Sequence, residues 1–120
     1  MNWEGLDDRV NCDRLIARFA GGASFRCLVR SGADEREIRL TDGRMAPVAR
    51  GPFVMPQSDF ALTGAAEAWH RFARPRPAPG DQDLFGFFRR GEIALAGDTR
   101  KFYAHLLCLK LILEKLRAEA

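Results

Sequence analysis

The stretch from Phe87 to Phe102 constrains the fold most, because it contains two signals that end one element and begin another. Gly91 stands where a helix would end in a left-handed conformation, which glycine adopts without strain. Apolar and small or polar residues then alternate up to Gly97, as in a short strand. Asp98 is suited to cap a following helix, because its carboxylate can accept a backbone N–H. The stretch therefore predicts a helix end, a strand and a helix start.

This order of elements carries a resemblance to a known family. Phe-Phe-Arg-Arg precedes the strand, Gly-Asp-Thr follows it, and a long apolar helix comes next. The combination resembles the C-terminal signature of the sterol carrier protein type two family and of its small bacterial lipid-binding relatives, including an accessory protein of ubiquinone biosynthesis. The resemblance implies a five-stranded sheet that, together with its helices, encloses an apolar tunnel.

The rest of the chain predicts one helix, four strands and two further helices before this stretch. Asp42-Gly43 is the strongest hairpin signal, since a type I′ turn needs positive φ at both central residues. Pro47 confines the third strand to an edge or a short span. The expected elements are a helix at Leu6–Ala20, strands at 24–30, 37–41, 44–49 and 58–63, a helix that Thr63 or Gly64 caps and that includes Phe72, a helix that Asp81 caps, a strand at 92–96, and a last helix from Asp98 to about Ala118.

The order α-β-β-β-β-α-α-β-α predicts an α+β fold. Strands linked by hairpins and followed by segregated helices are typical of a largely antiparallel sheet covered by helices. The expected sheet has five strands and is sterol-carrier-like. A length of 120 residues predicts one domain over residues 1–120.

Composition and charge exclude several classes of function. The 19 basic residues are scattered among 16 acidic ones without a basic stripe, which argues against nucleic acid as a partner. No apolar stretch is long enough to predict a transmembrane segment, and the first residues do not predict a signal peptide. The three cysteines are widely spaced and predict neither a disulfide framework nor a metal site, so we expect a cytoplasmic protein.

The candidate functional residues are apolar. The last helix has apolar residues around more of its circumference than one core-facing stripe needs, and aromatic residues cluster near the final strand. Together with the family resemblance, this predicts an internal hydrophobic cavity for a fatty acyl, isoprenoid or quinone-like lipid, without cofactor or catalytic group. The predicted lining consists of Phe60, Leu62, Trp69, Phe72, Phe88, Ile93, Phe102, Leu106, Leu109 and Leu113.

Two alternatives remain open at this level. The chain could be a protein-interaction module with a solid core, whose apolar C-terminal helix pairs with a second copy or with an enzyme. It could also be a small enzyme that uses Cys108 and His105, which are neighbours on one helix. We expect no activity from this pair, because a thiol among leucines stays protonated.

Overall fold

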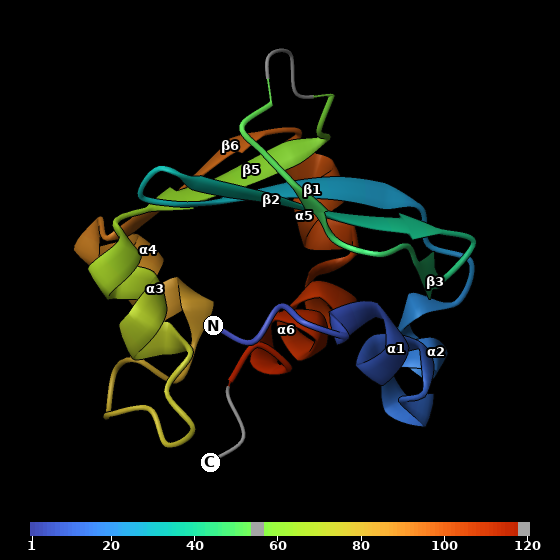
Figure 1. The fold of residues 1–120 in the computed structure, drawn as a ribbon, viewed down its shortest axis with the longest axis horizontal. Coiled ribbons are helices and arrows are strands. Elements are labelled where there is room, and N and C mark those ends of the chain that lie inside the picture. Colours follow the sequence, from blue (N-terminus) through green and yellow to red (C-terminus); the bar gives the residue numbers. More distant parts are fainter. Residues whose placement is uncertain (54–56, 118–120) are drawn as a thin grey trace.

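One mixed sheet forms the upper layer of the computed structural model, which describes residues 1–53 and 57–117 (Figure 1). Its strand order is β3-β2-β1-β5-β6, and β4 pairs with β2 off this path. The predicted α+β class is therefore confirmed. The strands are β1 (Phe25–Ser31), β2 (Asp34–Thr41), β3 (Arg44–Met45), β4 (Ala49–Arg50), β5 (Phe60–Gly64) and β6 (Ile93–Gly97).

The strand pairs are antiparallel with one exception at the centre of the sheet. β1 and β2 form a hairpin in which Phe25 pairs with Leu40, and β5 pairs with β6 so that Phe60 lies opposite Gly97. β1 and β5 are parallel. The largely antiparallel character expected from the hairpin signals is thus present, and the parallel pair joins the N-terminal hairpin to the C-terminal strands.

The helices lie beneath one face of this sheet (Figure 1). The two N-terminal helices lie under one end of the sheet, and α3 and α4 lie under the other end. The last two helices pass between them, and the core fills the space between sheet and helices. The helices are α1 (Leu6–Asn11), α2 (Arg14–Ala20), α3 (Ala66–Phe72), α4 (Leu84–Arg90), α5 (Thr99–Ala104) and α6 (Leu106–Glu114).

The two longest predicted helices are each divided in the structure. The expected helix at Leu6–Ala20 breaks because Asp13 caps a new helix, accepting the N–H groups of Leu15 and Ile16 at 2.9 and 3.1 Å. The last helix breaks at His105, which has φ −113°. The His105 ring stacks on Phe25 of β1 with ring centroids 5.2 Å apart, so this residue joins the helix to the sheet. The predicted end near Ala118 lies outside the described residues.

Three local predictions were wrong. Asp83 caps α4 by accepting the Phe85 N–H at 3.1 Å, whereas Asp81 is buried among arginines. Neither Thr63 nor Gly64 caps α3, because β5 extends to Gly64 and Ala65 precedes the helix without a capping side chain. The predicted strand at 44–49 is instead two separate two-residue strands, β3 and β4, on either side of residues 46–48.

The other turn and cap predictions are confirmed. Asp42 and Gly43 have φ values of 50° and 79°, as the hairpin turn requires. Gly91 ends α4 with φ 73°. Asp98 caps α5 by accepting the Lys101 N–H at 3.1 Å. These correct signals fix how α4, β6 and α5 follow one another around the candidate site.

Candidate functional site

The ten predicted lining residues come together between the sheet and the helices. Two lie on β5, one on β6, two on α3, one each on α4 and α5, and three on α6. Eight of them are buried members of one hydrophobic core, and Phe88 and Leu106 pack against that core while remaining partly exposed. The buried eight are Phe60, Leu62, Trp69, Phe72, Ile93, Phe102, Leu109 and Leu113.

Aromatic rings connect the sheet to the helices through this layer. Phe102 of α5 packs edge-on against Phe60 of β5, with centroids 5.5 Å apart. On its other side Phe102 meets Phe88 of α4 at 6.0 Å. Phe60 in turn stacks on Phe25 at 5.7 Å. The rings form a continuous apolar path from β1 to the surface of α4.

Trp69 anchors a second branch of the layer under the other end of the sheet. Its indole Nε1 donates a hydrogen bond to the backbone oxygen of Arg30 at 2.9 Å, which fixes the ring against β1. Phe72 packs edge-on against Trp69 at 5.9 Å, and Phe87 against Phe72 at 6.0 Å. This branch joins α3 and α4 to the underside of the sheet.

The layer is closed in this structure. Leu62, Trp69, Phe102 and Leu109 each have 0% exposed surface, so no space large enough for a water molecule touches them. A hollow of about 10 Å³ lies at the edge of the layer, roughly the size that holds one water molecule. Ligand pockets are on the order of 300–1,000 Å³, so a lipid tail would need the helices to separate. The hollow is surrounded by Phe72, Gln82, Asp83, Leu84, Lys110, Leu113 and Glu114.

The layer reaches the surface between α4 and α5. Phe85 packs against Phe88 at 5.5 Å and stacks on Tyr103 at 6.4 Å. Tyr103 is 56% exposed, and its ring lies 5.1 Å from that of the fully buried Phe102. We call these four residues the aromatic seam: Phe85, Phe88, Phe102 and Tyr103. Sequence reasoning did not include Phe85 and Tyr103 in the lining, although Phe85 precedes Phe88 by the three residues that place both on one helix face.

One exposed ion pair borders the aromatic seam. Lys110 of α6 lies 3.0 Å from a carboxylate oxygen of Asp83, the residue that caps α4. The same ammonium group lies 5.5 Å from the centroid of the Phe85 ring. Exposed pairs of this kind contribute about 0–1 kcal/mol, so this contact is a weak link between α4 and α6.

A cluster of charges holds the opposite side of α4. Arg90 lies 2.9 Å from Asp81 and also pairs with Glu92, while Arg71 of α3 contacts both of these carboxylates. Hydrogen bonds from Arg90 and Arg71 hold the pKa of Glu92 below its ordinary value. The Arg90 guanidinium also lies 4.7 Å from the centroid of the Phe87 ring. Because each charge is partnered, this ion cluster (Arg71, Asp81, Arg90 and Glu92) is structural.

Cys108 and His105 are poorly placed for catalysis. Cys108 is buried, and burial raises the pKa of its thiol to about 11, so the thiol is protonated at neutral pH. The His105 ring stacks on the Phe25 ring.

Within residues 1–53 and 57–117, no group of three or more His, Cys, Asp or Glu side chains could hold a metal ion. Among the same residues, no helix combines the length and apolarity that crossing a bilayer requires.

Comparison with known proteins identifies the fold through structure alone. No family model matches the chain, and no curated protein matches it. A crystal structure of sterol carrier protein 2 aligns with a TM-score of 0.77 at 12% identity, covering 98% of this chain and 95% of that one. A Thermus thermophilus protein described as possibly a sterol carrier protein aligns with a TM-score of 0.67 at 12% identity, covering 98% and 87%.

A third similar structure is that of a ubiquinone synthesis protein. The UbiJ-SCP2 ubiquinone synthesis protein aligns with a TM-score of 0.59 at 13% identity, covering 89% of this chain and 88% of that one. All three alignments span nearly the whole of both chains, so the likeness includes the sheet and the helices that form the closed layer. At these low identities the shared property is the fold. The chain therefore has the sterol carrier protein 2 fold.

Proposed function

We propose that this chain binds the apolar tail of a lipid between its sheet and helices α4 to α6, as a carrier or as an accessory in lipid biosynthesis. The observation that carries the proposal is the aromatic seam, where a buried apolar layer in a sterol-carrier fold reaches the surface. A fatty acyl, isoprenoid or quinone-like tail would fit a layer lined by aromatic and branched side chains. The similar structures, of a sterol carrier protein and of a ubiquinone synthesis protein, favour the same ligand class.

Binding would require the seam to open. The closed conformation and an open one would exchange, and a tail that binds only the open state would shift the population toward it. Each methylene removed from water contributes roughly 0.8 kcal/mol, so a long tail can offset an opening cost of several kcal/mol. α4 and α5 have only seven and six residues, and the rings of the seam hold them together by apolar contact.

The mechanism is burial and needs no catalytic group or cofactor. The thiol of Cys108 is protonated at neutral pH and is therefore no nucleophile, and the His105 ring packs against Phe25 of the sheet. We therefore propose a non-enzymatic role, in a compartment such as the cytoplasm where the three free cysteines stay reduced.

Titration with a fluorescent fatty acid tests the proposal, with native mass spectrometry to count bound molecules. We expect one tail per chain with micromolar or tighter affinity. Phe88→Asp would place a charge in the seam and weaken binding by about tenfold or more, because an unpaired charge in apolar surroundings is costly. Leu107→Asp is the matched control, because Leu107 is 58% exposed on α6 and should leave affinity unchanged. Absence of binding for tails of every length would refute the proposal.

A second candidate is an interaction module with a solid core. Four large apolar side chains are about half exposed, at Leu15 and Phe19 of α2 and at Tyr103 and Leu107 near the break between α5 and α6. A second copy of the chain or an enzyme could cover them. Sedimentation would show an oligomer that Leu107→Asp splits, in a protein that binds no lipid tail.

A further inference from the structure

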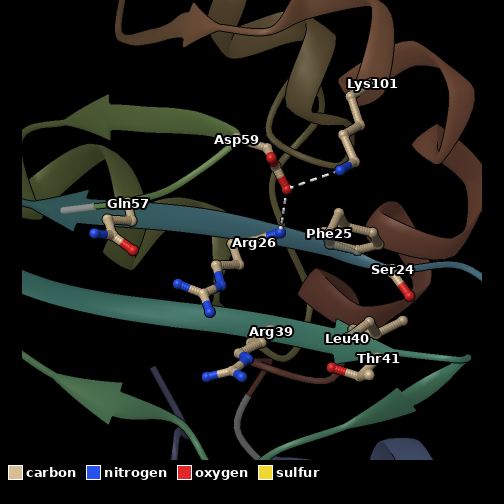
Figure 2. A pocket seen from close by; sticks show the side chains of 9 residues that line it. All are labelled: Ser24, Phe25, Arg26, Arg39, Leu40, Thr41, Gln57, Asp59 and Lys101. Atoms are coloured by element: carbon tan, nitrogen blue, oxygen red, sulfur yellow. Dashed lines mark hydrogen bonds and ion pairs between the residues drawn. The ribbon is translucent and has the colours of Figure 1, made fainter.

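A polar hollow at the end of the sheet lies apart from the apolar layer (Figure 2). Its volume is about 390 Å³. Arg26 of β1 and Arg39 of β2 extend into it from neighbouring strands, and Lys101 of α5 borders it (Figure 2). Its lining consists of Ser24, Phe25, Arg26, Arg39, Leu40, Thr41, Gln57, Asp59 and Lys101.

The two arginines form an unusual pair. Arg26 and Arg39 lie directly opposite each other in the β1–β2 register, so their side chains are on the same face of the sheet. Like charges directly opposite each other destabilise a sheet. Further along the same strands, Arg30 lies opposite Glu35 and pairs with it at 2.8 Å. The β1–β2 hairpin thus places opposite charges across from each other at Arg30 and Glu35, but like charges across from each other at Arg26 and Arg39.

The acidic groups near this pair do not neutralise it. The Asp59 carboxylate accepts the backbone N–H of Arg26 at 2.8 Å and contacts the Lys101 ammonium at 3.2 Å (Figure 2). Glu37 precedes Arg39 by two residues on the same face of β2 but is not within 4 Å of either guanidinium. Among the side chains that the structure describes, Arg26 and Arg39 have no ion-pair partner, so the hollow carries excess positive charge.

We propose that this hollow binds a small oxyanion of the phosphate class, either a free phosphate monoester or the phosphate of a lipid headgroup. Guanidinium groups match phosphate oxygens in bidentate geometry, and two of them facing one ligand would relieve their mutual repulsion. Further donors are at hand: the Gln57 amide borders the hollow, and Ser24 Oγ accepts the Asp42 N–H at 3.0 Å, which leaves its own hydrogen free to donate. The site lies outside the apolar layer and does not depend on lipid-tail binding.

Calorimetric titration and thermal unfolding with defined probes test this site. Inorganic phosphate and glycerol 3-phosphate should each bind and raise the unfolding temperature, since a ligand of the folded state stabilises it. Binding of glycerol 3-phosphate together with vesicles of phosphatidic acid, but not phosphatidylcholine alone, would identify a headgroup site. Binding of the soluble probes alone would identify a free-phosphate site. Failure of all these probes to bind would overturn the proposal.

Matched variants locate the binding. Arg26→Gln and Arg39→Gln should each weaken phosphate binding by about tenfold or more, because a charge-assisted hydrogen bond is lost. Without phosphate, neither should be less stable than the unmodified protein, because the like-charge pair is removed. Glu37→Gln should strengthen binding about twofold, since a nearby negative charge is removed. Arg18→Gln, on the exposed face of α2, is the control. Equal affinity in all four variants would contradict the assignment.

Discussion

On one side of α4, Arg90 belongs to the ion cluster that ties this helix to α3 and to the residue before β6, and Phe87 lies against the Arg90 guanidinium. On the other side, Phe85 and Phe88 face α5 through rings alone, with the exposed Lys110–Asp83 pair at the margin. The backbone of α4 is also close to the preceding loop on the ionic side, where a Cβ at Gly86 would lie 2.5 Å from the Gly80 oxygen.

The difference between the ionic and the aromatic side of α4 indicates which side would separate if a lipid tail enters. Separating charges that are partnered and partly buried leaves each of them without its partner, which is costly. Separating aromatic rings costs apolar contact, and a lipid tail that enters between them restores that contact. We therefore expect α4 to stay attached along its ion cluster while the aromatic seam parts.

The largest expected effect comes from removing the central ring of the seam. Phe102→Ala should lower the free energy of unfolding by about 3–5 kcal/mol, because a fully buried Phe leaves a cavity that its neighbours fill only in part. Urea unfolding measures this loss. A cost below about 1 kcal/mol would mean that the layer is already loosely packed, contrary to its lack of exposed surface.

The second prediction concerns the ionic side of α4. Asp81→Asn should lower the free energy of unfolding by about 1–2 kcal/mol, because two arginines lose a partner but keep Glu92 and some solvent. Affinity for a lipid tail should not change. Glu67→Gln removes an exposed partner of Arg71 and serves as the control with little effect. A loss of lipid affinity in Asp81→Asn would indicate that α4 opens on its ionic side, contrary to the opening expected at the aromatic seam.

The third prediction is a pH dependence of the ion cluster. The pKa of Glu92 is lowered from its ordinary 4.5 by hydrogen bonds from Arg90 and Arg71, so the cluster stabilises the fold fully above about pH 4.5. This stabilisation is lost as the pH falls further, through the lowered pKa. Urea midpoints between pH 7 and pH 3 should fall less steeply in Glu92→Gln than in the unmodified protein. Parallel curves would show that the cluster contributes nothing.

The smallest expected effect is at the margin of the seam. Lys110→Met removes an exposed ion pair worth less than about 1 kcal/mol, so stability should hardly change. Opening would become easier, and a fatty acid should associate about two- to threefold faster in stopped-flow fluorescence. Lys115→Met, which removes the comparable pair with Asp13 far from the seam, is the control. Equal rates in both variants would argue against entry through the aromatic seam that this pair borders.

Local backbone signals were the most predictable part of the fold. Gly91, Asp98 and the Asp42-Gly43 turn each specify a backbone conformation through their own chemistry, and the structure confirms all three. The capping role of Asp81 was wrong because its buried carboxylate serves Arg71 and Arg90, which the sequence does not place beside it. Similarly, the last helix is divided at His105, whose ring stacks on Phe25 of β1, and the sequence does not indicate this contact between residues far apart in the chain.

The sequence predicted which residues share the apolar layer but not how tightly that layer packs, and their role in ligand binding stays a prediction. Apolar periodicity brought ten residues into one layer, since burial follows from which face of each element is apolar. Periodicity does not report packing density, so the sequence could not distinguish an open tunnel from a closed layer. Nor did it indicate that Phe85 and Tyr103 continue the layer to the surface, because the stacking of α4 on α5 is a tertiary contact.

The most direct test of tail binding in this layer uses Trp69 as a reporter. Trp3→Phe leaves Trp69, which is fully buried in the same core as Phe102 of the seam, as the one remaining tryptophan of the two in the chain. Stearic acid carrying a nitroxide on its chain should quench Trp69 fluorescence saturably at micromolar concentration, and unlabelled stearic acid should reverse the quenching. Binding without quenching of Trp69, or no binding at all, would contradict a lipid tail between the sheet and helices α4 to α6.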